Sequence, residues 1–423
     1  MLSVVMVCLA ATWVPPRILA AELLSGLGTA LGVALVAKSP RKYVRYLPLA
    51  MIGGLVFLGA ALRSSLRSNN PKNDFLQFYI GAKYVGAKDF YGESSRAASE
   101  ESRRQGQFPM PFVRLPFYAL LLYPLARMKY ATAYILWQAG SVLCLLAGSL
   151  AWRPYRASVA LGCAWSLPIA MVLIRGQDVS LMFLLLSLAV ALAYYEKPGL
   201  SGGILAMCAI KWNIVLTLPL LVLKHQSPRF RAGFGLVVLV LIALSYLVAG
   251  IDWPAKYIHL ILLPELSPHA SQMPNLRGLI QQAPFFPYVA AVMASAVLLL
   301  DWMVVKSTCT LEYKMAATLV SSILLSPHAY VYDCAVLIPF LVAVAYQTTR
   351  TGLRYISILL LTPALYALLS LPGCYFIPSA ALLVFLIVLT IDAIRKQGSP
   401  TPFLDHWNVV PTARDLRRAE VSG

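Results

Sequence analysis

A carboxylate that follows a predicted membrane span is the first candidate for chemistry in this sequence. Asp74 lies beyond the apolar run 47–62, directly before Phe75, and near the start of the polar segment 63–114. A base at a membrane surface can take the proton from the hydroxyl group of an acceptor. We therefore identify Asp74 as the candidate catalytic base. Its simpler role is the N-cap of a helix expected at 75–87, because aspartate is a favoured N-cap residue.

Any reaction at the membrane that releases a phosphate would need cations or hydrogen-bond donors to meet its charge. The candidates for these phosphate contacts are Lys211, Arg277, His328, Arg175 and Arg114. A lysine at membrane depth is costly unless it reaches water or a partner, so we expect two short helices with Lys211 at the turn between them. Arg277 could instead pair with membrane lipids. His328 could instead cap a helix or bond a carbonyl.

A second set of polar and aromatic residues could contact a sugar or an acceptor. Tyrosines can stack on sugar faces, but an interfacial aromatic belt explains exposed tyrosines equally well. Two of these residues begin a predicted span, where helix capping is the simpler role. The acid of the set near His328 either orients that histidine or is a buried, paired acid. The set is Tyr79, Gln177, Asp178, Asn275, Tyr332 and Asp333.

Neither a metal site nor a redox pair is expected. The sequence has no dense cluster of carboxylates and histidines of the kind that a metal ion needs. None of its 7 cysteines forms a Cys-x-x-Cys pair. Most of the cysteines lie in apolar runs and are expected to be small core residues. We therefore expect no metal and no other cofactor.

The composition indicates an all-α integral membrane protein. Of the 423 residues 59% are hydrophobic and 12% are charged, whereas soluble domains carry about 25% charged residues. Apolar stretches recur along the whole chain, and a membrane span needs roughly 20 such residues. We expect a polytopic helical bundle of about 11–13 membrane segments. The net charge of +18 is explained by basic cytoplasmic loops rather than by nucleic-acid binding.

The chain divides into three parts. Residues 1–45 form additional N-terminal membrane segments and a basic cytoplasmic loop, and residues 395–423 form a polar cytoplasmic tail. Between them, 46–394 form the transmembrane catalytic domain. Its outer loops are 67–114, with short amphipathic helices, and 250–282. This orientation follows from the positive-inside rule.

The run 115–127 decides the orientation of the following loops. It is too short to span straight, so we expect it to be tilted or re-entrant. If it does not cross, Arg153 and Arg156 face the cytoplasm, opposite to Asp74. If it does cross, both arginines face outward.

The order of these motifs resembles glycosyltransferase family 87, a group first described as a domain of unknown function. The resemblance covers about 46–394. Three positions depart from the family pattern: Met110-Pro111-Phe112 replaces a Tyr-Pro-Pro-like start, Trp212 follows Lys211, and Val179 follows Asp178. The matching pieces are Asp74-Phe75-x-x-Phe78-Tyr79 with Phe90-Tyr91, Pro116 with Pro124-Leu125-Ala126, Ala133 and Trp137, Gly176-Gln177, Gly202 with Lys211, Asn275-Leu276-Arg277-Gly278, and Ser326-Pro327-His328 with Tyr332-Asp333.

The resemblance implies a membrane glycosyltransferase of the GT-C superfamily. Its expected donor is a polyprenyl-phosphate hexose, with mannose as the expected sugar, and its acceptor is a glycolipid or an envelope glycan. Transfer would be inverting, with Asp74 as the base, on the outer face of the cell membrane. The alternative from another class is a transporter or flippase of lipid-linked sugars, although the sequence shows no internal repeat. A non-catalytic membrane scaffold is the third possibility.

Overall fold

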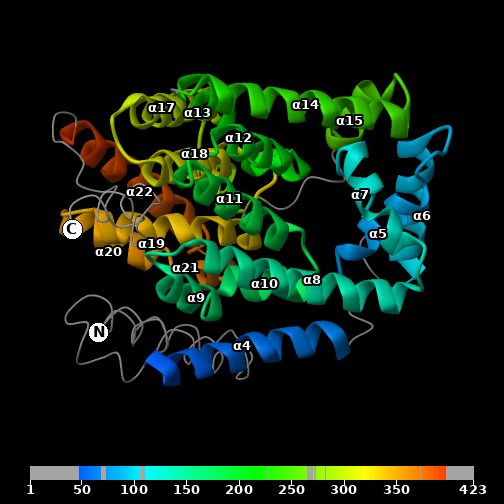
Figure 1. Cartoon of the computed structure of the whole chain (residues 1–423), viewed down its shortest axis with the longest axis horizontal. Coiled ribbons are helices and arrows are strands. Elements are labelled where there is room, and N and C mark those ends of the chain that lie inside the picture. Colours follow the sequence, from blue (N-terminus) through cyan, green and yellow to red (C-terminus); the bar gives the residue numbers. More distant parts are fainter. Residues whose placement is uncertain are drawn as a thin grey trace, which may run out of the picture.

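The computed structural model describes residues 47–67, 73–104, 110–225, 227–263, 270, 273–281, 283–371 and 373–396. The predicted N-terminal segments at 1–45 and the tail beyond 396 lie outside this part of the chain. Within it every regular element is a helix (Figure 1), so the predicted fold class, an all-helical polytopic membrane protein, is confirmed.

Long apolar helices form the body of the bundle. Judged by length and composition, 4 helices among the described residues can cross a membrane, or up to 6 if each of two bent pairs counts as one span. Several shorter apolar helices pack between them, so the total of eleven to thirteen segments stays a prediction. The 4 long helices are α8 (Tyr130–Ala151), α14 (Pro228–Ala249), α17 (Phe286–Lys306) and α22 (Ile377–Arg395).

Two predicted spans are bent rather than straight. The run predicted at 157–174 is α9 (Arg156–Ala164) and α10 (Leu167–Arg175), which meet at 62°. Ser166 caps α10 by accepting a hydrogen bond from the Ile169 amide, and a proline in its first turn cannot continue the preceding helix. A proline also starts the second half of the other bent pair. That pair is α20 (Thr351–Leu359) with α21 (Pro363–Ala367) and η6 (Leu368–Ser370).

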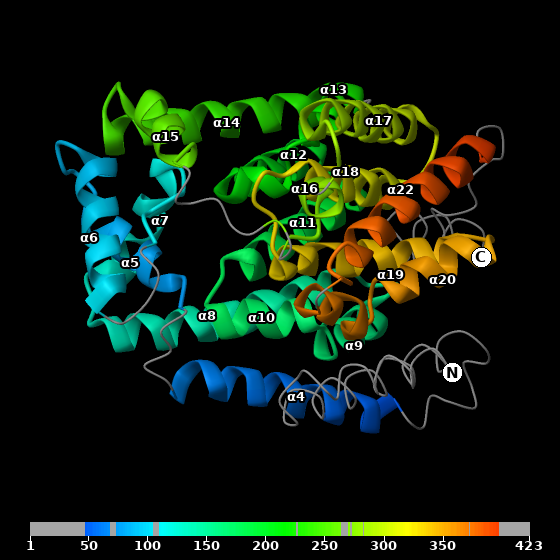
Figure 2. The same ribbon diagram turned by 180° about the vertical axis from the view of Figure 1, so that it is seen from behind.

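A group of short helices covers one end of the bundle, as Figures 1 and 2 show from opposite sides. The helix expected at 75–87 ends at Lys83 and is buried on all sides from Phe75 to Ala82, so the prediction that it is amphipathic is wrong. The second helix of this loop, α6, has one buried face, with Phe90, Ser94, Ala98 and Ser102 at intervals of four residues. An ion pair of 3.0 Å between Lys256 and Asp89 joins α15 to the start of α6. The group comprises α5 (Phe75–Lys83), α6 (Phe90–Arg104), α7 (Pro116–Ala126) and α15 (Trp253–Ile261).

Helix α8 runs from this end of the bundle to the opposite end. At its first residue, the Tyr130 hydroxyl accepts a hydrogen bond of 2.9 Å from Asn73. Just beyond its last residue, Arg153 lies over the ring of Tyr195. The helix has 22 residues and is therefore about 33 Å long, close to the thickness of a bilayer core. Arg153 and Asp74 thus lie at opposite ends, as they must if the run 115–127 does not cross.

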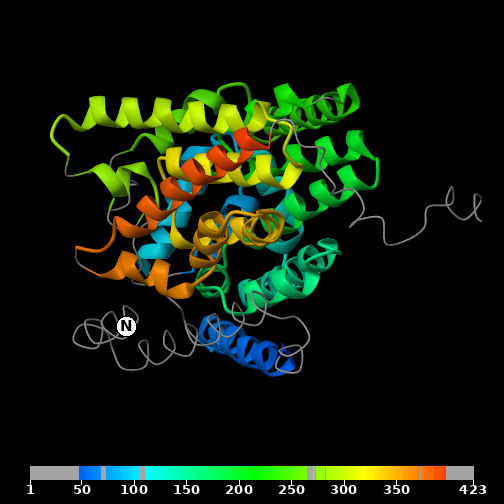
Figure 3. The ribbon, with the colours of Figure 1, turned by 90° about the vertical axis from the view of Figure 1, so that its left-hand side faces the viewer.

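The remaining helices fill the space between these ends. Helix α4 (Leu47–Arg67) packs on α9 and α10 at the margin of the bundle (Figure 3). Helices α11 (Val179–Tyr194), α12 (Pro198–Ala206) and α18 (Leu311–Leu325) occupy the centre. The rest of the set is η2 (Met207–Ile214), α13 (Leu218–Lys224), α16 (Leu276–Ile280), η5 (Val331–Leu337) and α19 (Ile338–Gln347).

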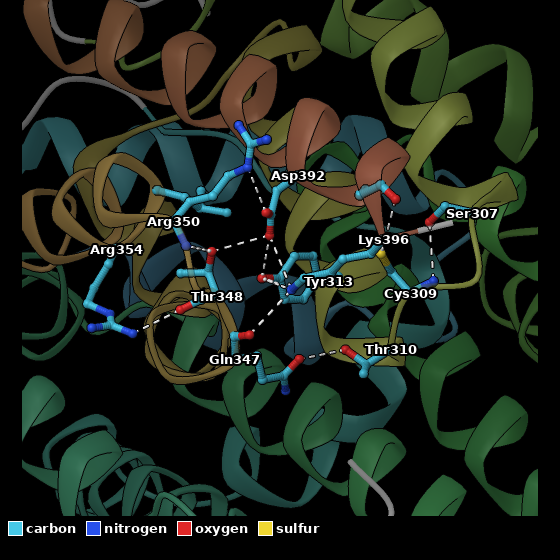
Figure 4. A network of polar contacts seen from close by, with 12 residues as sticks. Ser307, Cys309, Thr310, Tyr313, Gln347, Thr348, Arg350, Arg354, Asp392 and Lys396 are labelled. Carbon is cyan, nitrogen blue, oxygen red and sulfur yellow. Dashed lines mark hydrogen bonds and ion pairs between the residues drawn. The ribbon is translucent and has the colours of Figure 1, made fainter. Parts of the chain in front are cut away.

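The end far from Asp74 is held together by a buried carboxylate (Figure 4). Asp392 of α22 pairs with Arg350 at 3.0 Å and with Lys396 at 3.2 Å. It also accepts hydrogen bonds from the hydroxyls of Tyr313 at 3.0 Å and Thr348 at 3.2 Å. These partners come from α18 and from the segment between α19 and α20. One carboxylate therefore ties several helices together where their apolar faces end.

Replacing Asp392 with alanine should lower the free energy of unfolding by about 2 kcal/mol, because two cations and two hydroxyls lose one shared acceptor. Denaturant unfolding in detergent micelles measures this change. Asp252→Ala is the matched control, since Asp252 is exposed and its side chain caps nothing; it should change stability by less than about 0.5 kcal/mol. Equal effects of the two substitutions would contradict the role given to Asp392.

Candidate functional site

The predicted site residues come from segments far apart in sequence. They meet beside the short helices that cover one end of the bundle. Asp74 directly precedes α5, and Arg114 precedes α7. Gln177 and Asp178 lie in the turn between α10 and α11. Two further residues come from irregular helical segments, Lys211 from η2 and Asp333 from η5. We call these six residues the first cluster.

Asp74 occupies the N-cap position of α5, but its side chain makes no capping hydrogen bond. The side chain of Asn73 bonds the start of the helix instead, because its oxygen accepts a hydrogen bond of 2.9 Å from the Phe75 amide. The Asp74 amide donates to the Arg175 carbonyl at 2.8 Å, and its carboxylate accepts from the Gln177 side chain. The capping alternative for the Asp74 carboxylate is therefore wrong.

Asp74 also differs from the other acids in its surroundings. Its exposed fraction is 9%, whereas Asp178 and Asp333 are 0% exposed. Burial raises the pKa of Asp74 above its ordinary value, against the opposing effects of Arg175 and the Gln177 hydrogen bond. A carboxylate with a raised pKa and partial exposure is suited to accept a proton from a substrate.

A glycine turn holds Asp74 against the bundle. Gly176 has a φ of 62°, a left-handed conformation that side chains other than glycine rarely adopt. A Cβ atom there would lie 2.8 Å from Oδ1 of Asn73. The Trp137 indole donates to the Gly176 carbonyl at 2.9 Å, and the ring of Phe75 stacks on Trp137. The turn and the Asp74 segment therefore touch without an intervening side chain.

Lys211 is buried and compensated by acids. Its backbone breaks the helical segment, with φ of −136° and ψ of 63°. Its Nζ lies 2.6 Å from Asp333 Oδ1 and 3.7 Å from Asp178 Oδ1, and 4.7 Å from the centre of the Tyr332 ring. Only 3% of the residue is exposed. We predicted a break at Lys211 and either water or a partner for its charge; the break is present, and carboxylates are the partners.

Asp178 is held by two cations. The Arg114 guanidinium donates to the Asp178 carboxylate from Nε at 2.7 Å and from Nη2 at 3.2 Å. This forked geometry gives strong guanidinium–carboxylate pairs. The Arg114 guanidinium also lies over the ring of Phe78. Asp178 is the N-cap residue of α11, yet its side chain makes no capping bond. The capping alternative for Asp178 is therefore wrong.

A second cluster of polar residues adjoins the first. Asn275 accepts a bond of 2.9 Å from the Gly278 amide, which caps α16, and donates at 2.8 Å to the Ser326 carbonyl. Asn213, two residues after Lys211, donates to the Ser326 hydroxyl at 3.1 Å and to the His328 carbonyl at 2.6 Å. The side chains of this cluster therefore fix the Ser-Pro-His segment beside η2.

Arg277 supplies positive charge in this second cluster, and His328 supplies an imidazole. Both residues are half-buried. Burial, together with the nearby charge of Arg277, lowers the pKa of His328, so that the neutral imidazole is favoured at neutral pH. A neutral imidazole still offers one N–H donor beside a permanent cation. An anion bound between them would restore the charged form of the histidine.

Comparison with known proteins gives one family. The family model of glycosyltransferase family 87 matches residues 112–327, just over half of the chain. The chain belongs to glycosyltransferase family 87. No curated protein and no solved structure matches the chain. The predicted family is therefore confirmed.

The matched range holds part of the candidate site, and tertiary contacts supply the rest. Arg114, Gln177 and Lys211 lie inside 112–327, whereas Asp74 lies outside. The Gln177 hydrogen bond joins Asp74 to the matched segment. Residues beyond the matched range reach the same place through Lys211, namely Tyr332 and Asp333.

One predicted residue lies outside both clusters. The Tyr79 hydroxyl donates to the Met128 carbonyl at 2.6 Å, and its ring packs edge-on against Tyr130. Its suggested contact with a sugar stays a prediction. Among the described residues no group of His, Cys, Asp and Glu is placed to hold a metal ion. Whether the glycosyltransferase needs a metal also stays a prediction.

Three contributors were not singled out from the sequence. Asn73 caps α5 in place of Asp74, while Asn213 and Ser326 join the two clusters. Each is adjacent, or nearly so, to a residue that was chosen. The signal that could have found them is their position beside chosen residues. Asn73 precedes Asp74, Asn213 lies two positions after Lys211, and Ser326 begins the Ser-Pro-His motif.

Gly176→Ala should disrupt the glycosyltransferase site. The strained φ and the contact with Asn73 should lower the unfolding free energy by about 1–3 kcal/mol, and displacement of Asp74 should reduce the rate of sugar transfer at least about tenfold. Gly140→Ala is the control, because Gly140 lies within α8 and a Cβ there meets nothing within 4 Å. Full activity of the Gly176 variant would show that the turn does not position the base.

Proposed function

We propose that this family 87 enzyme transfers a hexose, expected to be mannose, from a polyprenyl-phosphate donor to a glycolipid or envelope glycan. The base would be Asp74, and the transfer would invert the anomeric configuration. One observation carries the choice of base. Asp178 and Asp333 are 0% exposed and bound in ion pairs, whereas Asp74 keeps 9% of its surface exposed and is held by a neutral amide.

In the proposed reaction Asp74 accepts the proton of the acceptor hydroxyl as that oxygen attacks the anomeric carbon. The bond from this carbon to the phosphate oxygen breaks on the opposite face, and the polyprenyl phosphate leaves with the electron pair. Inversion follows from this in-line displacement. The product is the glycosylated acceptor, and the proton remains on Asp74 until water removes it.

The charge that develops on the leaving phosphate needs donors that are free to meet it. Lys211 and Arg114 already pair with carboxylates. Arg175 lies near Asp74, where its charge opposes the rise in the pKa of that acid. Arg277 and His328 are half-buried and adjacent, so we assign the phosphate to them. Lys211 and Arg114 then hold the acids in place rather than the donor.

An apolar cavity supports a donor with a hydrocarbon chain. It has a volume of about 390 Å³ and opens between α13, α17 and α18. Leu325 lines it and directly precedes Ser326 of the second cluster. A chain lying there would place its phosphate beside Arg277 and His328. The cavity is lined by Leu216, Thr217, Pro219, Leu220, Leu298 and Leu325.

The distribution of cations supports an outward-facing site in the cell membrane. Cytoplasmic loops of membrane proteins collect lysine and arginine. Cations gather in the loops and helix ends far from Asp74, and aromatic rings and Asp392 hold several of them there. The Asp74 end would then face outward. The far-end cations include Arg153, Lys197, Lys224, Lys306, Arg350 and Lys396.

The central test compares wild type with Asp74→Asn in membranes at matched expression. Transfer of radiolabelled mannose from polyprenyl-phosphate-mannose should fall by about 10²–10⁴-fold, the usual contribution of a positioned base. Donor binding and thermal unfolding should change little, because asparagine has the same shape. Asp252→Asn, at an exposed site near the same end, serves as the control.

Undiminished transfer by Asp74→Asn would remove this residue from the mechanism. Absence of transfer by the wild type with every polyprenyl-phosphate sugar tried would contradict the proposed reaction and favour a transporter of lipid-linked sugars. The two outcomes are distinct, since the first needs an active wild-type enzyme.

Filling the cavity should weaken binding of a long-chain donor. Leu298→Trp should raise KM about tenfold, the loss of roughly two buried CH₂ groups, while leaving kcat similar. A donor analogue with a short, soluble chain should show no such change. Leu299→Trp is the control, because Leu299 is exposed and does not line the cavity. Equal KM changes for both donors would place the chain elsewhere.

A further inference from the structure

Gln177 lies between the proposed base and the buried cation Lys211. Its Nε2 donates to Asp74 Oδ2, and its Oε1 accepts from Lys211 Nζ at 3.3 Å. The residue is 2% exposed. Turning the amide over would place its oxygen against a carboxylate and its NH₂ group against an ammonium. The two neighbours therefore fix the orientation of the side chain.

The positive charges near Gln177 are shared unequally among the acids. Lys211 pairs with Asp333 at 2.6 Å and with Asp178 at 3.7 Å. Arg114 pairs with Asp178 at 2.7 Å. Gln177 stands where Lys211 would otherwise approach Asp74. A direct ion pair with a cation lowers the pKa of a carboxyl group by about 1–3 units and makes it a weaker base.

We propose that Gln177 is a positioning residue that serves as a neutral spacer, orienting the Asp74 carboxylate while keeping Lys211 from pairing with it. The inference rests on the proposed function, since it needs Asp74 to act as the base. It differs from the sugar contact predicted for Gln177 from the sequence. Both ends of the buried amide are already engaged within the protein, so the side chain acts through Asp74.

Several groups from different parts of the chain face Asp74 besides this amide. Burial raises the pKa of Asp74, and Arg175, Gln177, Lys211 and Arg114 oppose that rise. The charge of Asp74 also reaches three phenols, one in α8, one at the N-cap of η5 and one within η5. Among these groups Gln177 alone bonds both Asp74 and Lys211 in the described contacts. The phenols are those of Tyr134, Tyr330 and Tyr332.

The sign of the pH dependence follows from these contacts. Transfer needs the charged form of Asp74, so kcat/KM should fall as the pH drops through the pKa of this acid. Because burial raises that pKa, the acid limb of the wild type should lie above the ordinary aspartate range of about 3.9. Changes at Gln177 should then move this limb in a direction that depends on whether space is left for Lys211.

The test measures kcat/KM against pH for the full-length wild type, Gln177→Met and Gln177→Ala. Methionine fills the same space but donates no hydrogen bond, so the acid limb should move up by about half a unit to one unit. Alanine leaves a gap through which Lys211 can reach Asp74, so the limb should move down by about one unit or more. Opposite shifts are the signature of a spacer.

A control at a neighbouring glutamine separates the spacer from packing. Gln138 is also buried, but it bonds Tyr134 and the Leu173 carbonyl rather than Asp74. Gln138→Met should therefore lower stability without moving the acid limb. Folding of every variant is checked by size exclusion and thermal unfolding in detergent.

Shifts of the same sign in both Gln177 variants, or unchanged profiles, would overturn the proposal. If the alanine variant does not fold, Gln177→Met alone still decides, since an unmoved or lowered limb contradicts it. Failure of the proposed function itself would show separately, as undiminished transfer by Asp74→Asn. Loss of that role and loss of the spacer are thus distinguishable.

Discussion

The site depends on the burial of one ammonium group. Lys211 lies away from water with Asp333 at 2.6 Å and Asp178 at 3.7 Å. Removing a charge from water costs several kcal/mol, and only close partners recover it. The carboxylates must therefore come from other helices to meet it. Arg114 then pairs with Asp178, so that a single buried charge brings the segments before α7, α11 and within η5 together.

This constraint also explains why the site is built from turns and irregular segments. Lys211 breaks its helix, Gly176 adopts a left-handed conformation, and Asp333 lies in a 3₁₀ segment. Regular helices would direct these side chains outward at fixed intervals. Breaks in helices let the backbone turn so that side chains from several elements point to one place. The long helices supply the frame, and α8 separates the two polar ends by about one bilayer thickness.

The proposed division of labour follows from which charges are already paired. Asp178 is a poor base because, against the effect of burial, its two cations lower its pKa, and Asp333 is fully buried beside Lys211. Asp74 is held instead by a neutral amide and stays partly exposed. Arg277 and His328 belong to the second cluster, and the apolar cavity proposed for a lipid chain is lined by Leu325, which directly precedes Ser326 of that cluster. Base, phosphate contacts and chain thus occupy neighbouring but separate places.

The sequence by itself determined the class of the protein and most members of its site. Runs of apolar residues predict membrane helices because burial in lipid needs about 20 of them, and rare polar residues such as Lys211 stand out against that background. It could not determine their partners. Helix capping was an open alternative for Asp74 and Asp178, and water was one of two possible partners for Lys211, because sequence rules depend only on adjacent residues. Only the tertiary structure decided that Gln177 bonds Asp74 and that Asp178 pairs with Arg114, since these contacts join residues 103 and 64 positions apart.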